Sequence, residues 1–264
     1  MRARPGKSSG LSDSGPNARP SVRRARTIRL FIVSFIAAIF PALYILREFR
    51  KRDIFPEPPR VIWTTFGLGI LCIIPALFLA VVITIIIPPP QDMILSGLHA
   101  AFLQAAIPEE LAKFAVLYIY CARQSHFDEP MDGLVYGVTA SLGFAAFENV
   151  VYVLDGGLGV ALMRALTAVP SHGLDGAIMG YFIAFHIFLP FHKARYLALS
   201  LAMPILLHGL YDFPLMIMRD ASPVLGFLPL VVLAVEGLIF LRLFRRFHGI
   251  QKAAHALTRP QQPT

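Results

Sequence analysis

The chain has 264 residues, of which 56% are hydrophobic and 15% are charged, and it carries a net charge of +8 at pH 7. Its mean hydropathy of +0.64 excludes an ordinary soluble domain, because several apolar runs are long enough to cross a bilayer as helices. The basic residues flank these runs, as they do in cytoplasmic loops of membrane proteins, so nucleic acid is not an expected partner. The two cysteines, Cys72 and Cys121, exclude a disulfide framework and a CxxC metal site.

The pattern predicts an all-α fold, a polytopic transmembrane helical bundle of about seven helices, within a range of roughly six to eight. Residues 1–27 are rich in Ser, Pro, Gly and Arg and are expected to form a disordered basic tail. The transmembrane domain is expected over 28–244, followed by a basic cytoplasmic tail over 245–264. The predicted helices cover about residues 28–46, 61–87, 93–122, 131–154, 158–189, 197–218 and 224–244.

Charged loops follow the first, third and fifth predicted helices, at 47–60, 123–130 and 191–196. The positive-inside tendency places these loops and the C-terminus in the cytoplasm, which puts the N-terminus outside. The basic tail before the first helix conflicts with that orientation. Two solutions remain open: a re-entrant first segment, or a tail translocated despite its charge.

The third predicted helix holds two adjacent carboxylates where the sequence otherwise indicates membrane. Pro108 is expected to kink or break the helix there and to begin a new half-helix, which puts Glu109 and Glu110 in its first turn. Lys113 is within helical reach of either. One carboxylate could pair with Lys113 while the other faces a cavity as a general base, Glu110 being slightly preferred. The alternative is a structural ion pair that locks this helix to a neighbour.

The fourth and fifth predicted helices each carry a pair of glycines at a spacing that favours close helix packing. These pairs are Gly133 with Gly137 and Gly176 with Gly180. The fifth helix is longer than one span requires, so it is expected to tilt or to begin partly unwound, with a kink at Pro170.

Polar side chains recur inside the later apolar segments. Glu148 and Tyr152 share a helix face, and Asn149 beside them suits an interhelical hydrogen bond. His172 is more often a packing residue than a ligand when taken alone. His208 differs, because Asp212 lies four residues later and a carboxylate can orient an imidazole.

Two chemistries fit these residues if the helices bring them together. In one, a glutamate activates water and a histidine stabilises the oxyanion. In the other, a divalent metal such as zinc is bound, with Glu148, His172 and His208 as candidate ligands and a free glutamate as base. The cofactor is therefore none or one divalent metal. The sequence contains no HExxH, GxSxG or Walker pattern.

The order of these motifs resembles the PrsW family of intramembrane proteases. The resemblance covers roughly residues 47–212 and includes the Asp-x-x-Pro-Glu-Pro-Pro stretch at 53–59. It implies peptide-bond hydrolysis in the bacterial cytoplasmic membrane, a membrane-protein substrate such as an anti-sigma factor cut at a first site, and the lipid bilayer as surroundings. The implied catalytic residues are Glu109, Glu110, Glu148, His172 and His208, supported by Lys113, Asn149, Tyr152 and Asp212.

An alternative of another class uses the same carboxylates as a relay in a proton-coupled transporter, or holds them in a non-catalytic membrane scaffold. No inverted repeat is evident in the sequence. The grouping of Glu, His and Asp residues favours the protease.

Overall fold

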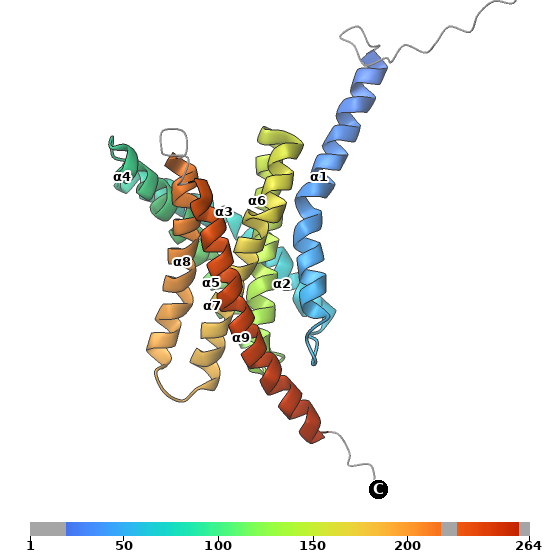
Figure 1. The fold of residues 1–264 in the computed structure, drawn as a ribbon, viewed down its shortest axis with the longest axis vertical. Helices are drawn as coiled ribbons and strands as arrows, with labels where there is room; N and C mark the ends of the chain where they lie inside the picture. The colour runs from blue at the N-terminus through green and yellow to red at the C-terminus, as the bar shows by residue number, and fades with distance from the viewer. Residues whose placement is uncertain (1–19, 218–225, 259–264) are drawn as a thin grey trace, which may run out of the picture.

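The computed structural model describes residues 20–217 and 226–258, and within them every regular element is helical, which confirms the predicted all-α class. Figure 1 shows the helices running mostly side by side, with α1 and α8 on opposite sides of α6 and α7. The elements are α1 (Pro20–Arg50), α2 (Pro59–Leu71), α3 (Ile73–Ile86), α4 (Met93–Leu98), a π-helix (His99–Ala106), α5 (Ile107–Ala115), a second π-helix (Val116–Tyr120), a 3-10 turn (Cys121–Arg123), α6 (Pro130–Leu166), α7 (Ala168–Phe188), α8 (Lys193–Ile217) and α9 (Leu228–Thr258).

Four helical stretches of the described chain are long and apolar enough to cross a membrane. They are Ile32–Arg50, Pro59–Ile86, Pro130–Phe188 and Lys193–Ile217. The third covers both α6 and α7 and therefore contains a reversal of the chain. By length and composition, these stretches fit the predicted integral membrane bundle.

The ends of the bundle differ from the prediction. Helix α1 begins at Pro20, inside the segment predicted as a tail, and continues unbroken to Arg50, which does not fit a re-entrant first segment. Helix α9 extends to Thr258, into the predicted C-terminal tail. The remaining parts of both predicted tails, and residues 218–225 around the predicted start of the last helix, lie outside the described residues.

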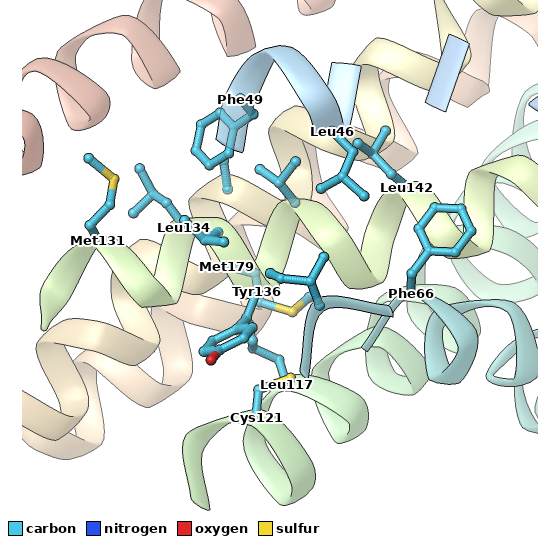
Figure 2. Packing of buried hydrophobic residues seen from close by; sticks show 14 of the residues in the cluster. Leu46, Phe49, Phe66, Leu117, Cys121, Met131, Leu134, Tyr136, Leu142 and Met179 are labelled. Carbon is cyan, nitrogen blue, oxygen red and sulfur yellow. The ribbon is translucent and has the colours of Figure 1, made fainter. Parts of the chain in front are cut away.

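Helix α6 forms the centre of the molecule, because every residue from Met131 to Ala146 is buried. Its neighbours contribute apolar side chains from several directions: Leu46 and Phe49 from α1, Phe66 from α2, and Met179 from α7. Figure 2 shows these residues gathered around Leu134, Tyr136 and Leu142 of α6. The sequence predicts α6 as one of about seven equivalent helices, whereas in the structure the other helices pack around it.

Close contact between α6 and α7 depends on the two predicted glycine pairs, which meet each other. A Cβ atom added at Gly133 or Gly137 would lie under 3.0 Å from the carbonyl oxygen of Gly180 or Gly176, and the reverse holds as well. The absence of side chains lets the two backbones touch. This contact fixes the position of α7, which carries His172, relative to α6, which carries Glu148.

Gly180→Ala is expected to destabilise the protein by roughly 1–3 kcal/mol, because its methyl group would overlap the Gly133 carbonyl and force α6 and α7 apart. Thermal unfolding of the purified protein in detergent measures the effect. Gly237→Ala on α9 is the matched control, since a Cβ there meets nothing within 4 Å. An unchanged unfolding temperature for Gly180→Ala would show that α6 and α7 do not touch at this point.

The backbone breaks in two places, one in the C-terminal part of α6 and one at its junction with α7, and neither is at a proline. Gly157 has φ 72° and ψ −166°, a conformation that favours glycine, and it reverses the chain. Thr167, with φ −125° and ψ −74°, separates the returning helical segment from α7. The predicted kink near Pro170 is present at Thr167, three residues earlier, which leaves Pro170 in the first turn of α7, where a missing N–H costs nothing. Helical structure likewise continues through Pro108, changing from π to α at Ile107.

Acidic side chains gather at the end of the bundle where α1 ends and α6 begins. The side-chain amide of Gln251 on α9 donates to Asp53, at 2.7 Å, and to Glu129. Burial raises the pKa of Glu129 to about 7, against the opposing effect of the Gln251 hydrogen bond. Burial also raises the pKa values of Asp53 and Glu57. Glu57 in turn accepts a hydrogen bond from the Tyr136 hydroxyl.

The unfolding temperature is therefore expected to fall as the pH rises from about 4 to about 7. The folded protein holds the Glu129 proton more tightly than the unfolded chain does. The stability that this group contributes is therefore fully present at a pH below the pKa of Glu129 in the unfolded chain. It is lost as the pH rises through the pKa of Glu129 in the folded protein. Glu129→Gln should flatten this part of the profile. The two buried cysteines, Cys72 and Cys121, provide the readout, since a thiol-reactive dye labels them on unfolding. An equally steep profile in the variant would assign the dependence to other groups.

Candidate active site

The two adjacent glutamates lie in the first turn of α5, as predicted, and both contact the same lysine. Lys113 Nζ lies 2.7 Å from Glu110 Oε1 and 3.5 Å from Glu109 Oε2. The expectation that only one carboxylate pairs with Lys113 is therefore wrong, because the long lysine side chain reaches back between them. Lys113 and Glu110 are fully enclosed, and the Lys113 ammonium also lies 4.3 Å from the centre of the Phe144 ring.

His208 of α8 faces α5 from the other side. Its Nδ1 lies 2.8 Å from Glu110 Oε1, and its Nε2 lies 3.2 Å from Asp212 Oδ2 and 3.9 Å from Glu109 Oε2. Both ring nitrogens thus face carboxylate oxygens, which fixes the ring plane. The predicted pairing of His208 with Asp212 is present, and Glu110 is the partner that the sequence pattern did not provide.

His172 of α7 joins α5 to α6. Lys113 Nζ lies 3.0 Å from His172 Nδ1, and His172 Nε2 lies 2.8 Å from Glu148 Oε2. Since an ammonium only donates, Nδ1 accepts and Nε2 carries the proton that is donated to Glu148. The interactions form one chain from Glu148 through His172 and Lys113 to Glu110 and His208.

The two imidazoles meet at the centre of this chain. Their ring centres are 5.1 Å apart and their planes are nearly perpendicular, at 86°. Beside them is a cavity of about 20 Å³, which is room for about one water molecule. The polar residues that line it include Glu148, Arg164, His172, His208 and Asp212.

The two remaining predicted supporting residues lie close to Glu148 and contact Arg164. Asn149 donates to the carbonyl of Ala38 on α1 at 2.9 Å and accepts from Arg164 Nε at 3.2 Å. Asn149 is therefore an interhelical clamp. The Arg164 guanidinium lies 3.9 Å from the centre of the Tyr152 ring, a cation–π contact.

Two groups of side chains in the described chain have ligand atoms close enough to share one metal ion. One consists of Glu109, His172 and His208, and the other of Glu110, Asp175 and His208; within each group the atoms lie within 4.8 Å of one another. Both contain His208. The predicted ligand Glu148 belongs to neither group and instead bonds to His172.

Three charged residues that sequence reasoning did not assign to the site also contribute to it. Arg164 forms an ion pair with Glu148 at 2.7 Å. Glu236 on α9 is fully buried and accepts a hydrogen bond from Ser171, the neighbour of His172, at 2.8 Å. Asp175 is buried one helical turn after His172 and has one oxygen without a hydrogen-bond partner among the described residues. A lone charge within an apolar run was the available signal for Arg164 and Glu236.

Comparison of the chain with known proteins identifies its family. The PrsW family intramembrane metalloprotease profile matches residues 57–235. "Protease PrsW" of Bacillus subtilis is 37% identical over 180 residues, which is 67% of this chain and 80% of the relative. "Protease PrsW" of Geobacillus kaustophilus is 35% identical over 181 residues, 68% and 78% of the two chains, and that of Clostridioides difficile is 30% identical over 198 residues, 69% and 79%.

No solved structure matches the chain. The family match spans α2 to the first part of α9 and so includes each of the predicted site residues, from Glu109 to Asp212. Several relatives exceed 30% identity over about two thirds of this chain and most of their own length. The chain therefore belongs to the PrsW family and is an intramembrane protease, an endopeptidase that works in the lipid bilayer on membrane-protein substrates.

Proposed function

We propose that hydrolysis takes place where α5, α6, α7 and α8 meet, with Glu109 as the reactive carboxylate. The proposal rests on the state of Glu109 Oε2: this oxygen is buried and has no hydrogen-bond partner among the described residues. It lies 3.9 Å from His208 Nε2 and 3.5 Å from Lys113 Nζ. A buried carboxylate oxygen without a donor is suited to accept a proton from water or to bind a cation.

Glu110 has a different role in this proposal. Its Oε1 is shared between Lys113 and His208, at 2.7 and 2.8 Å, so it positions those two groups. Glu109 takes a proton from the attacking water as the water oxygen bonds to the peptide carbonyl carbon. His172 and His208 stabilise the oxyanion that forms, and the proton then passes to the leaving amine as the C–N bond breaks.

The same residues fit one divalent metal ion. A carboxylate and two imidazoles form the ligand set of many catalytic zinc sites, and Glu109, His172 and His208 can each offer an atom within 4.8 Å of the others. Those three residues would hold the ion, and Glu109 Oε2, which has no hydrogen-bond partner among the described residues, supports that choice. When bound, the metal would acidify its water and polarise the substrate carbonyl. With one ring nitrogen of His208 on the ion, the carboxylate that faces the other nitrogen, Glu110 at Nδ1 or Asp212 at Nε2, would orient the ring.

The proposed orientation has the C-terminus in the cytoplasm of a bacterium, in its cytoplasmic membrane. The end of α1, the α7–α8 loop and the end of α9 lie at the same end of the molecule in Figure 1. All three are rich in Lys and Arg, which supports a cytoplasmic location. Glu148 lies in the half of α6 that is away from these basic segments, and Asp212 lies in the corresponding half of α8. In the proposed orientation this is the outer half of the membrane. Such a position supports first-site cleavage of an anti-sigma factor or a similar membrane-bound regulator near its external side.

Comparing new protein N-termini in membranes of cells that express wild type or Glu109→Gln tests this proposal. Termini in or near membrane segments that appear only with wild type would support it and would identify the substrate. Glu48→Gln is the control, because Glu48 pairs with Arg47 and Lys51 near the end of α1 and does not line the cavity beside the histidines, so its loss should leave cleavage unchanged. Equal peptide sets from all three inserted proteins would favour the transporter or scaffold alternative.

A further inference from the structure

The cavity beside the two histidines is too small for any peptide. Its volume of about 20 Å³ accommodates about one water molecule, whereas a scissile bond must approach Glu109 and His208 closely to react. The described structure is therefore a closed form, and some part of the wall must move before a substrate enters. The need for that movement rests on the proposed function of this cavity.

Residues 158–166 contribute Arg164 to the wall of this cavity. Gly157 and Thr167, both with non-helical backbone angles, flank these residues like two hinges. A straight helix would hold Asn149 and Arg164 about 22 Å apart, yet their side chains are bonded at 3.2 Å, so this segment folds back along α6. We call residues 158–166 the return segment.

The return segment presents mainly apolar side chains outward. Leu162, Met163 and Leu166 are 57%, 64% and 73% exposed, so they face the bilayer rather than the core. On its inner face, Ala161 is buried in a small cluster with Ala38 and Val153. This cluster is much smaller than the core that holds α6 and α7 together. Local displacement of the segment therefore costs little free energy.

Arg164 supplies the remaining attachment, and its partners among the described residues lie on one turn of α6. It pairs with Glu148 at 2.7 Å, bonds to Asn149 at 3.2 Å and stacks on Tyr152 at 3.9 Å. Arg164 also lines the cavity. Its displacement would therefore widen the cavity and release the carboxylate that is bonded to His172.

We infer that the return segment is a substrate gate and that Arg164 is its latch. In the closed form the Arg164–Glu148 ion pair holds the gate over the histidines. Opening swings the segment about Gly157 and Thr167 toward the bilayer, the side from which a membrane-embedded substrate arrives. Arg164 is thus a positioning residue that acts through Glu148 and does not touch the scissile bond.

Alkylation of a buried thiol in native membranes tests the latch without any proteolysis. Ala161→Cys, in a background with Cys72→Ala and Cys121→Ala, introduces a thiol that only an open gate exposes, because Ala161 is fully buried. Adding Arg164→Gln should raise its rate of reaction with a small membrane-permeant maleimide by about tenfold, since a charge-assisted contact of this kind is lost. The natural Cys121, also fully buried, is the matched control in a Cys72→Ala background and should not change.

Equal rates at the introduced thiol with and without Arg164→Gln would overturn the latch. A rise at both thiols would mean that the substitution loosens the whole protein, which would also overturn it. Because the alkylation needs no substrate, its rates decide for or against the latch even if the proposed catalytic function fails.

A second measurement links the gate to turnover. An oxidised pair made by Ala38→Cys and Ala161→Cys would tether the return segment to α1 within their shared cluster. Cleavage should fall at least about tenfold on oxidation and return on reduction, whereas either single cysteine variant should respond to neither treatment. Undiminished cleavage by the disulfide-bonded protein would show that the gate does not control substrate access. If the disulfide does not form, the alkylation rates decide alone.

Discussion

Glu110→Gln is expected to lower the rate of substrate cleavage by at least about a hundredfold and to destabilise the protein by roughly 3 kcal/mol. Glu110 Oε1 contacts both Lys113 and His208, at 2.7 and 2.8 Å, and those two side chains are buried. The neutral amide keeps the shape but leaves the enclosed Lys113 ammonium with a weaker counter-charge, at 3.5 Å on Glu109. Cleavage of a membrane substrate and thermal unfolding in detergent provide the two readouts.

The double variant Glu110→Gln with Lys113→Gln separates structural from catalytic effects. Removing both charges avoids an uncompensated buried ion, so part of the lost stability should return. Cleavage should not return, because His208 still lacks the Glu110 carboxylate at its Nδ1. A double variant no more stable than the single variant would contradict the ion-pair explanation, and full activity in either would contradict the positioning role.

His208→Ala and His172→Ala are each expected to reduce cleavage by about 10²–10³-fold while leaving the protein inserted and folded. His208 connects Glu110 with Asp212, and His172 connects Lys113 with Glu148, so each loss interrupts the polar chain at the cavity. The measurement is the initial rate of cleavage in membranes normalised to the amount of inserted protein. Wild-type rates in either variant would remove that histidine from the proposed mechanism.

His186→Ala on α7 is the matched control for the two histidine variants. His186 lies at the far end of the same helix, where it bonds to the Lys193 carbonyl at 3.0 Å and packs against the Tyr118 ring. Its rate should stay near that of wild type. Metal content of the same preparations distinguishes the two mechanisms: a stoichiometric divalent ion that is lost from both site variants supports the metal-bound form, whereas an active, metal-free wild type supports direct activation of water by Glu109.

The sequence by itself determined the features that depend on one helix. Apolar runs longer than a bilayer is thick require membrane helices, and this prediction of class is confirmed. Helical periodicity places Lys113 within reach of both glutamates and puts Asp212 next to His208, as the distances of 2.7, 3.5 and 3.2 Å show. Glycine spacing likewise indicated the faces along which α6 and α7 pack.

Only the tertiary structure decided which helix faces meet. The contacts between Lys113 and His172 and between Glu110 and His208 join residues that are 59 and 98 positions apart. A lone charge in an apolar run shows that a partner is needed but not which one, so Arg164 and Glu236 could not be connected to Glu148 and Ser171 in advance. The reversal at Gly157, by contrast, lies at the predicted boundary between the helices over 131–154 and 158–189, where glycine permits a positive φ, and the tertiary structure added the second break at Thr167.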